Sequence, residues 1–599
     1  MASEYVSVSN LRFLLFDVLA SPQLNRLGLY QDYDQEAYEL ALDAAKDIGD
    51  QFLFPIYREM DKNKAYHQDG VVHVHPGLKA AIKAIAEGGW IAAPDDFEHG
   101  GQQMPLSLLN ACIFIFYAAN ANAAAHAFLT QGAANLIRSF GDAGLQKTYI
   151  PPMYAGDWQG TMALTEPQAG SSLSDITTTA VLTTEGHYKL KGQKIYISGG
   201  DHSAVDNVVH LMLARIKGAP EGAKGISLFV VPKYRQENGK LVSNDVTTSG
   251  IFGKMGQKGY VAAQLMIGEK DDCQGYLVGA PHRGLPQMFQ MMNEARIATG
   301  LMATGTASGA YYASLQYAKE RPQGRHPSNK DTGQQQVLII EHADVRRMLL
   351  FQKAIVEGSL GLLLQCCYYA DLARATEDKE AREQAHLLLE LLTPIAKSYP
   401  AEMGTLAVST GMQVLGGAGY CDDFPLEQYY RDIRVNAIYE GTTGIHGLDL
   451  LGRKVMMADG KAATLFLREV QTTIKEAMKM PALDPFGRQL TAAAMGLHQT
   501  TMHLVELAMK EAPEIFLADA TLYLEYFGII AIGWQWLKQA IAAEKALAGA
   551  ERETEAFYRS KLAAFQYFFE YELPKTEGIR QRLHSSNRVT LETLPEWIL

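Results

Sequence analysis

One carboxylate lies in a short segment whose composition suits chemistry on a bound ligand. Residues 437–445 read Ala-Ile-Tyr-Glu-Gly-Thr-Thr-Gly-Ile, so Glu440 stands between an apolar approach and a turn of small residues. Partial burial raises the pKa of a carboxylate toward the value that a general base needs near neutral pH. Gly441 lets a ligand approach the backbone, and the hydroxyls of Thr442 and Thr443 suit a polar cofactor. Taken alone, a Glu-Gly pair is more typical of a helix end on the surface.

Three further segments combine small, hydroxyl and aromatic residues. Residues 161–172 read Thr-Met-Ala-Leu-Thr-Glu-Pro-Gln-Ala-Gly-Ser-Ser, a turn whose hydroxyl and N–H groups can hold a pyrophosphate or a planar ring, although a simple strand end has a similar composition. Residues 194–200 place Tyr196, a flat platform, beside a hydroxyl, but an aromatic residue in a strand more often packs in a core. Residues 413–420 form a Gly-rich turn without the Lys-Ser/Thr ending of a phosphate loop. Each segment alone is a weak signal.

The composition excludes several classes of protein. A chain of 599 residues should divide into roughly three to five domains. The net charge of −12 gives no basic surface for nucleic acid or an anionic membrane. The five cysteines form no CxxC pair, which favours reduced thiols. Residues 1–10 carry Glu4 and no positive region, so we expect no export signal. The most apolar stretches, residues 108–128 and 523–537, are interrupted or too short to span a bilayer. We expect a soluble cytoplasmic protein without a metal site.

The hydrophobic pattern predicts a mainly α protein with one central β-domain. Ala- and Leu-rich runs at helical spacing flank a region of β-branched runs separated by turns. The expected parts are an N-terminal extension (residues 1–35), an N-terminal helical domain (36–155), a central antiparallel β-domain (156–280), a C-terminal helical bundle (281–455) and an additional helical domain with a polar tail (456–599).

Together, in this order and spacing, the four segments resemble the acyl-CoA dehydrogenase flavoprotein family. The resemblance covers about residues 36–455, and the co-occurrence is far more specific than any one motif. It implies an N-terminal helical domain, a β-domain and a four-helix bundle, with FAD between the β-domain and the bundle. The N-terminal extension and the block after residue 455 are similar to the large bacterial branch that includes 3-methylmercaptopropionyl-CoA dehydrogenases.

The resemblance implies FAD as the cofactor and assigns residues to parts of its site. The residues expected at the flavin are Met162, Leu164, Thr165, Tyr196, Ser198 and Thr442. Ser171 would contact a flavin phosphate or the CoA arm. The residues expected to complete the FAD site of a neighbouring subunit are Arg321, Gln413, Gly416 and Gly417. The chain departs from the family pattern at three of these segments: Tyr196 replaces the usual Trp, Gly444 replaces the usual Gln, and no aromatic follows Arg321.

These cross-subunit matches imply a homo-oligomer. Closed two-fold assemblies are the commonest kind. The compact members of the family form dimers of dimers, but residues 456–599 could cover the surface used for the second pairing. We therefore expect a homodimer.

The resemblance makes Glu440 the catalytic base. It would remove the α-proton of an acyl-CoA thioester while a hydride leaves the β-carbon for flavin N5, which gives the trans-2-enoyl-CoA. The N–H of Glu440 and a ribityl hydroxyl would hold the thioester oxygen. Some relatives carry the base on another helix, at a position that is Ala295 here and cannot accept a proton. The residues expected to contact the substrate are Ser171, Asn293, Arg296 and Gly441.

The expected function is FAD-dependent dehydrogenation of acyl-CoA in fatty-acid β-oxidation, with electron-transfer flavoprotein as the acceptor. Two related activities stay open, namely a 3-methylmercaptopropionyl-CoA dehydrogenase and an acyl-CoA oxidase that passes electrons to oxygen. A nitroalkane-oxidising relative would prefer Asp at position 440, and a DNA-associated relative would need a basic C-terminal face that the charge balance does not support. A helical scaffold protein would not need four polar motifs.

Overall fold

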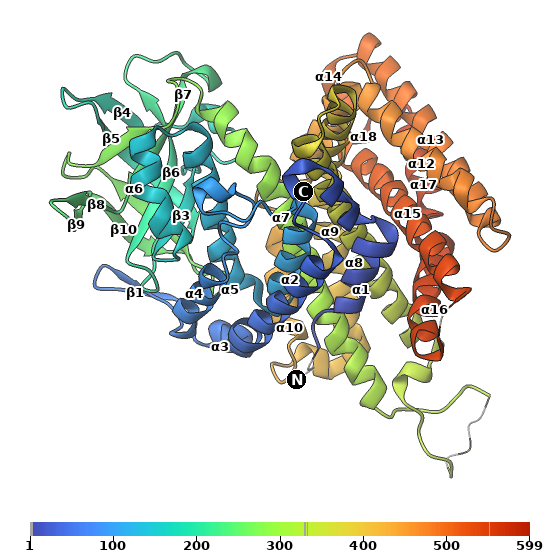
Figure 1. The fold of residues 1–599 in the computed structure, drawn as a ribbon. Helices are drawn as coiled ribbons and strands as arrows, with labels where there is room; N and C mark the ends of the chain where they lie inside the picture. Colours follow the sequence, from blue (N-terminus) through green and yellow to red (C-terminus); the bar gives the residue numbers. More distant parts are fainter. Residues whose placement is uncertain (1–3, 329–330, 332, 550, 599) are drawn as a thin grey trace. The chain divides into compact units, whose positions relative to one another are not determined.

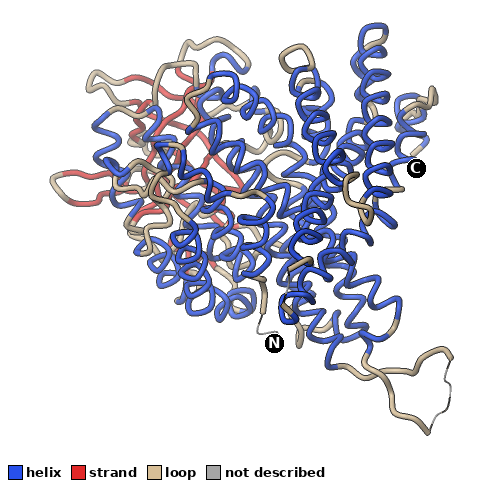
Figure 2. Tube along the Cα trace, turned by 45° about the vertical axis from the view of Figure 1, so that its right-hand side comes forward, coloured by secondary structure: helices blue, strands red, loops and turns tan. Residues whose placement is uncertain are grey.

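The computed structural model describes all residues except 1–3, 329–330, 332, 550 and 599. The chain folds into two compact units. Unit 1 comprises Met1–Leu42, Pro105–Phe114 and Arg296–Leu599, and unit 2 comprises Asp43–Met104 and Ile115–Ala295. Helices dominate unit 1, whereas the strands gather in unit 2, where Figure 2 shows them in red.

The centre of unit 2 is an eight-stranded sheet, several strands of which are labelled in Figure 1. Its strand order is β10-β11-β5-β12-β7-β6-β3, with β4 beside β5 and β6. Its strands are β3 (Trp158–Ala163), β4 (Thr179–Leu182), β5 (Tyr188–Ser198), β6 (Asn207–Ile216), β7 (Ile226–Pro232), β10 (Val246–Ile251), β11 (Ala262–Ile267) and β12 (Gln274–Leu277). The apolar runs of β6 and β7 form strands because side chains on both faces of these strands are buried.

Most strand pairs of the sheet are antiparallel, as the sequence predicts, but two pairs are parallel. Both β3 and β4 pair with β6 in parallel, with Trp158 opposite Asn207 and Thr179 opposite Arg215. No tight hairpin joins β3 to β6, since two other strands separate them along the chain. A long connection of this kind allows parallel pairing.

Alternate residues of the sheet enter two different cores. On β6, Leu211 packs in a core with residues of the helices α5 (Leu106–Phe140) and α6 (Ala143–Tyr154) and of the start of α7 (Gly284–Glu320). Its neighbour Met212 packs on the opposite face with Phe229 and Leu190. This follows from the two-residue period of a strand. The helices that contribute to unit 2 are α2 (Gln35–Ile48), α3 (Tyr57–Lys62), α4 (Gly77–Glu87), α5 (Leu106–Phe140), α6 (Ala143–Tyr154) and α7 (Gly284–Glu320); of these, α2, α5 and α7 also contribute to unit 1.

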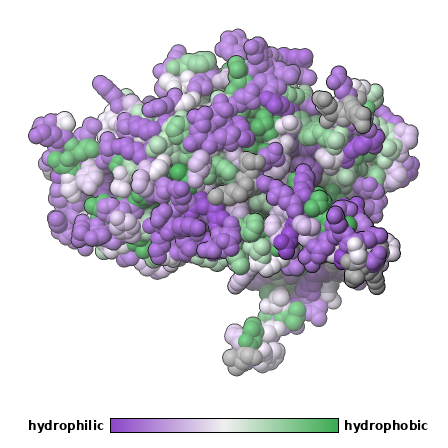
Figure 3. Space-filling view, turned by 90° about the horizontal axis from the view of Figure 1, so that it is seen from below, coloured by the Kyte–Doolittle hydropathy of each residue, from purple (hydrophilic) through white to green (hydrophobic). Residues whose placement is uncertain are grey.

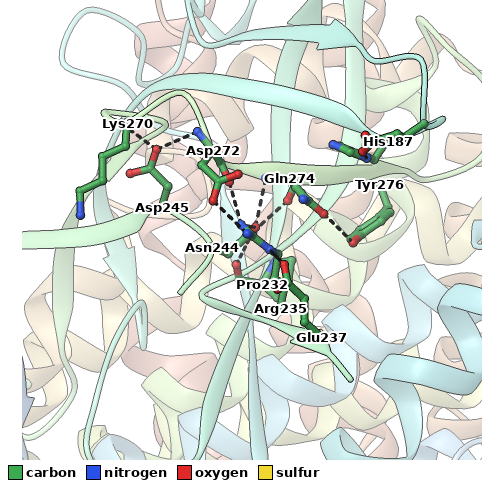
Figure 4. A network of polar contacts seen from close by, with 11 residues as sticks. His187, Pro232, Arg235, Glu237, Asn244, Asp245, Lys270, Asp272, Gln274 and Tyr276 are labelled. Carbon is green, nitrogen blue, oxygen red and sulfur yellow. Dashed lines mark hydrogen bonds and ion pairs between the residues drawn. The ribbon is translucent and has the colours of Figure 1, made fainter. Parts of the chain in front are cut away.

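Two hairpins accompany the sheet, namely β1 (Tyr66–Gln68) with β2 (Val71–His73) and β8 (Tyr234–Glu237) with β9 (Lys240–Ser243). A polar network fastens the second hairpin to the sheet (Figure 4). The guanidinium of Arg235 donates to the carboxylate of Asp272, and Asn244 accepts from the N–H of Gln274 at 3.0 Å. These bonds satisfy polar groups that burial would otherwise leave costly.

Unit 1 contains the helical bundle and the additional helical domain. The bundle elements are the second part of α7, α8 (Ala343–Ala375), α9 (Lys379–Leu415), α10 (Leu426–Ile433) and α11 (Thr443–Gly452). The additional elements are α12 (Lys461–Ala477), α13 (Asp484–Lys510), α14 (Pro513–Leu517), α15 (Ala520–Leu547), α16 (Arg552–Tyr567), α17 (Lys575–Leu583) and α18 (Val589–Glu592). The N-terminal extension contributes α1 (Val8–Arg12).

Helix α15 is the centre of the additional domain. It is apolar on all sides, as a helix surrounded by other elements must be. The indole of Trp536 donates to the carbonyl of Ala354 on α8 at 2.9 Å, and that of Trp534 donates to Thr473 on α12 at 2.9 Å. The domain is therefore packed directly on the bundle within unit 1.

A buried charge cluster joins α8, α16 and the N-terminal extension. The ammonium of Lys561 contacts the carboxylate of Glu357 at 2.7 Å and also donates to Asn10. Burial acts to raise the pKa of Glu357, but Lys353 and Lys561 lower it further than burial raises it. The charged form is therefore stable inside this part of unit 1.

Two helices, α5 and α8, are long and apolar enough to cross a membrane by length and composition. However, 94% of the most apolar window in α5 and 89% of that in α8 are buried inside the protein. Both therefore serve as core helices of the fold. On the face drawn in Figure 3, hydrophilic residues cover most of the surface and hydrophobic residues lie scattered among them.

Candidate active site

Glu440 lies in the short loop between the 3-10 turn Arg434–Ala437 and helix α11. Its φ is 54° and that of Gly441 is 88°, so two consecutive residues adopt the left-handed conformation. A residue other than glycine is strained there and stays only where its surroundings hold it. Thr442 then caps α11, because its hydroxyl accepts from the N–H of Ile445 at 3.3 Å.

Two buried side chains hold the carbonyl groups of this loop. The ammonium of Lys397, on α9, donates to the carbonyl of Gly441 at 2.7 Å. On α11, Nε2 of His446 lies 3.0 Å from the carbonyl of Glu440. A carbonyl only accepts, so Nε2 carries the proton. Burial lowers the pKa of His446 to about 3, which keeps the ring neutral near pH 7.

The charges around Glu440 act in opposite directions. Burial raises its pKa above the usual value, while Lys397 and Arg296 partly offset this effect. Burial in turn lowers the pKa of Lys397 to about 8, against the attraction of Glu440 and Glu402. A partly buried carboxylate with a raised pKa, kept close to ionisation by nearby cations, has the properties of a general base.

Arg296 ties helix α7 to α11 beside this loop. Its Nη1 lies 3.3 Å from Oδ2 of Asp449, and the two side chains are only 7% and 10% exposed. An arginine on a helix usually forms a solvated ion pair on the surface, but the ion pair of Arg296 is buried. Asn293 and Ala295 precede Arg296 on the same helix, in the part that belongs to unit 2. The substrate contacts expected of Asn293 and Arg296 stay predictions.

In unit 2, the loop after β3 is built around Glu166. Its carboxylate accepts hydrogen bonds from the N–H groups of Thr177, at 2.6 Å, and Thr178, at 3.1 Å, and from both of their hydroxyls. It also forms a buried ion pair with Lys194 of β5, Nζ to Oε1 2.8 Å. Burial acts to raise the pKa of Glu166, but Lys194 and these hydrogen bonds lower it to about 2.

This loop brings Thr165 next to the strand that carries Tyr196. The N–H of Ile195 donates to the carbonyl of Thr165 at 2.9 Å. Tyr196 itself has a φ of 56° and is 58% exposed, and its ring packs on Phe252 with centroids 4.2 Å apart. The interpretation of Tyr196 as an ordinary core aromatic is therefore wrong.

The remaining unit 2 residues expected at the flavin lie on the same elements. Met162 lies near the end of β3, and Leu164 directly follows that strand. Both side chains are partly buried against the core. Ser198, at the end of β5, is half-buried and opposite Ala262 of β11. Ser171 is exposed in the loop that follows β3. An exposed aromatic ring, partly buried apolar side chains and a hydroxyl on neighbouring elements are the kinds of group that suit a planar, polar-edged ligand such as a flavin.

The residues expected at a neighbouring subunit's FAD lie at one end of unit 1. Arg321 is exposed directly after α7. Gln413 is exposed near the end of α9, and a Cβ added at Gly416 or Gly417 would meet nothing within 4 Å. Tyr317, one turn before Arg321, packs edge-on against Phe424, whose ring centroid is 5.3 Å away. The end of α7 and the segment that follows the Gly-rich turn are therefore neighbours.

Sequence reasoning missed the residues that hold these loops. Glu166 and Lys194 stood inside quoted motifs without a role, and their charges in otherwise apolar, strand-like runs were the available signal. Lys397 and His446 carried no comparable local signal. Among the described residues, no group of three or more His, Cys, Asp or Glu could hold a metal ion.

The architecture defines the class of protein. Over 97% of this chain, the fold matches Caenorhabditis elegans ACDH-11 in complex with C11-CoA, with 95% of that chain covered, a TM-score of 0.73 and 20% identity. It also matches an acyl-CoA dehydrogenase complexed with FAD from Bacillus anthracis, over 94% of this chain and 90% of that one, with a TM-score of 0.66 and 20% identity. At these identities the likeness shows the fold alone, which is the acyl-CoA dehydrogenase fold.

Family models match nearly the whole chain. They describe an acyl-CoA dehydrogenase N-terminal domain (residues 35–157), middle domain (161–267) and C-terminal domain (282–456), followed by an acetyl-CoA dehydrogenase C-terminal-like domain (466–593).

Curated relatives give the same assignment. The chain is 34% identical to 3-methylmercaptopropionyl-CoA dehydrogenase of Ruegeria pomeroyi, over 96% of this chain and 97% of that protein. It is 33% identical to a butyryl-CoA dehydrogenase of Syntrophomonas wolfei, over 78% of each, and 30% identical to the broad-specificity linear acyl-CoA dehydrogenase FadE5 of Mycobacterium tuberculosis, over 99% and 98%. The chain belongs to the acyl-CoA dehydrogenase family of FAD-dependent oxidoreductases. The expected fold class, enzyme class and cofactor are confirmed.

Proposed function

We propose that the protein dehydrogenates a saturated acyl-CoA at the α,β-bond to the trans-2-enoyl-CoA, with Glu440 as the base. The observation that carries this proposal is the loop of Glu440. It presents a partly buried carboxylate with a raised pKa on a strained backbone that Lys397 and His446 hold. Strain retained at one position, with a titratable group on it, is typical of a catalytic site.

In this mechanism Glu440 accepts the α-proton at a carboxylate oxygen. The α-proton of a thioester is only weakly acidic, so the thioester carbonyl must be polarised as the proton leaves, and the N–H of Glu440 is the donor that we assign to it. When bound, FAD supplies the acceptor for the hydride that leaves the β-carbon.

Residues of unit 2 form the surface that we assign to the flavin. Tyr196, Met162 and Leu164 offer it apolar contact, and Thr165 and Ser198 offer it hydroxyls. The Glu166–Lys194 pair holds the backbone of this loop. We assign Ser171 to a phosphate of FAD or CoA, and Thr442 and Gly441 to the reacting end of the site.

The substrate class that we propose is a linear acyl-CoA, with electron-transfer flavoprotein as the acceptor. The names of the relatives from Syntrophomonas wolfei and Mycobacterium tuberculosis support it. A second candidate is 3-methylmercaptopropionyl-CoA, which is supported by 34% identity over 97% of the Ruegeria pomeroyi enzyme. We also propose a cytoplasmic homodimer whose domains are those expected from the sequence.

The test is anaerobic titration of the purified yellow protein with acyl-CoA thioesters. We expect flavin bleaching by butyryl-CoA or a longer linear thioester, and enoyl-CoA as the product. If only 3-methylmercaptopropionyl-CoA bleaches the flavin, the second candidate is correct. Rapid reoxidation by air would instead indicate an oxidase, and no bleaching by any thioester would contradict the dehydrogenase proposal.

A further inference from the structure

We infer that Lys397 is a positioning residue for Glu440: its buried ammonium group fixes the loop that bears the carboxylate and supplies a countercharge that favours the ionised form of that carboxylate. The catalytic meaning of this role rests on the proposed function. The contacts that support it lie entirely within unit 1.

The burial of Lys397 costs free energy, because its ammonium is removed from water. Its side chain is 0% exposed, on the stretch of α9 between Pro394 and Pro400 where every residue is buried. A charge removed from water needs a close partner or a compensating charge. Among the described residues, the ammonium of Lys397 donates a hydrogen bond to a neutral group, the carbonyl of Gly441, at 2.7 Å. Compensation must therefore come from nearby carboxylates, and Glu440 is the residue that precedes Gly441 in the loop.

Two carboxylates provide that compensation, namely Glu440 and Glu402. Both act to raise the pKa of Lys397, and Glu440 has the larger effect. Glu402 is exposed and accepts a hydrogen bond from the hydroxyl of Thr443 at 2.5 Å, so solvent screens its charge. The principal countercharge of the buried lysine is thus the proposed base.

The other charged and titratable groups around the loop do not replace this lysine. Arg296 acts on Glu440 less strongly than Lys397 does, and its guanidinium is already paired with Asp449 at 3.3 Å. His446 is neutral, because burial lowers its pKa to about 3. Lys397 is therefore the cation whose charge is chiefly balanced by Glu440.

The same ammonium also fixes the backbone. Glu440 and Gly441 have left-handed φ values of 54° and 88°, and their carbonyls are held from two different helices, by His446 of α11 and Lys397 of α9. One side chain therefore links the conformation of the loop to the ionisation of its carboxylate. A purely structural lysine would have only the first effect.

The experiment is a titration of Glu440 that needs no catalysis. The protonated-carboxyl infrared band of this residue is assigned by its loss in Glu440→Gln and followed against pH. In Lys397→Met, which removes the charge and the donor but keeps the length, we expect the midpoint to rise by about one unit or more. In Lys397→Arg, which keeps a charge, the midpoint should stay near that of the parent protein.

Lys454→Met is the matched control. Lys454 is also buried in unit 1, at 1% exposure, but it pairs with Glu390 rather than with the loop of Glu440. This control should leave the Glu440 midpoint unchanged. A folded Lys397→Met protein with the parent midpoint would overturn the inference, as would an equal shift in the control.

A reciprocal measurement decides the question if Lys397→Met does not fold. Coupling between two sites is mutual, so Glu440→Gln should lower the pKa of Lys397 by a similar amount. This pKa can be followed by 13C NMR of lysine labelled at Cε. An unchanged value in Glu440→Gln would refute the coupling. Neither measurement depends on turnover, so failure of the dehydrogenase proposal, seen as no flavin bleaching, stays distinguishable from failure of this one.

Discussion

Lys194 and Glu166 form an ion pair in which Nζ and Oε1 are 2.8 Å apart and the two side chains are 0% and 2% exposed. Lys194 also donates to the carbonyl of Leu164 at 3.0 Å. The pair thus fastens strand β5, which carries Tyr196, to the loop that carries Thr165. Buried pairs add little net stability, but the loss of one partner leaves the other charge uncompensated.

Glu166→Ala should therefore destabilise the protein strongly. We expect the free energy of unfolding to fall by about 3–5 kcal/mol, since Lys194 would stay buried without its countercharge. Denaturant unfolding of the purified protein measures this. Glu237→Ala is the control, because Glu237 is 48% exposed and its pair with Arg235 should contribute about 1 kcal/mol or less. Equal effects of the two variants would contradict the structural role of Glu166.

Stability should fall as the pH is lowered below about 6.5. Burial lowers the pKa of His202 to about 3 and that of His210 to about 4, both below the ordinary value of 6.5. Between these limits the unfolded chain binds protons that the folded protein excludes, so the folded state loses stability as pH falls. Below about pH 4.5 the contribution of Glu166, whose folded pKa is about 2, is lost in addition.

The free energy of unfolding measured against pH tests this expectation. Each such histidine contributes a slope of up to about 1.4 kcal/mol per pH unit in its window. His202→Asn should reduce the pH dependence of the free energy of unfolding between pH 6.5 and pH 3 by the contribution of one bound proton. An unchanged slope would show that His202 does not titrate as a buried neutral group.

Glu440→Gln should keep bound flavin but lose turnover. The amide preserves the shape of the side chain and cannot accept a proton, and a general base contributes on the order of 10² to 10⁴ in rate. Stopped-flow bleaching with the preferred acyl-CoA measures the effect. Glu294→Gln is the matched control, because Glu294 adjoins the alternative base position and accepts hydrogen bonds from Asn135. A wild-type rate in Glu440→Gln would show that another group is the base.

Arg321→Ala should weaken FAD retention. We assign its guanidinium to the FAD pyrophosphate of a neighbouring subunit, and charge-assisted contacts of this kind are strong and directional. Flavin content after gel filtration is the readout. Arg325→Ala is the control, since Arg325 lies in the same loop and donates to the carbonyl of Gln334 at 2.9 Å. Undiminished flavin occupancy in Arg321→Ala would remove this residue from the cofactor site.

The flavoprotein should be a homodimer of two 65.9 kDa chains. The motivating observation is that Arg321 and the Gly416–Gly417 turn are exposed at one end of unit 1, where they match family positions that complete a neighbour's cofactor site. Light scattering at several protein concentrations measures the mass. A monomer that is active and fully loaded with FAD would contradict both the dimer and the cross-subunit roles.

Much of this protein could be predicted from the sequence because the relevant signals are local. Helical and strand periodicity indicated the helical parts, the β-domain and the additional helical domain after residue 455, and four short motifs in a fixed order identified the family and FAD. Such features depend on neighbours in the chain, which a sequence displays directly.

The tertiary structure decided what holds these motifs in place. Lys397 reaches the carbonyl of Gly441 across 44 residues, and Lys194 reaches Glu166 across 28. The parallel pairing of β3 with β6 likewise depends on segments that are distant in the chain. The left-handed backbone at Glu440 and Tyr196 opposes the local preference of both residues and is maintained by such contacts. Long-range packing overrides local propensity at these positions, so the ionisation of the base and the geometry of its loop belong to the fold.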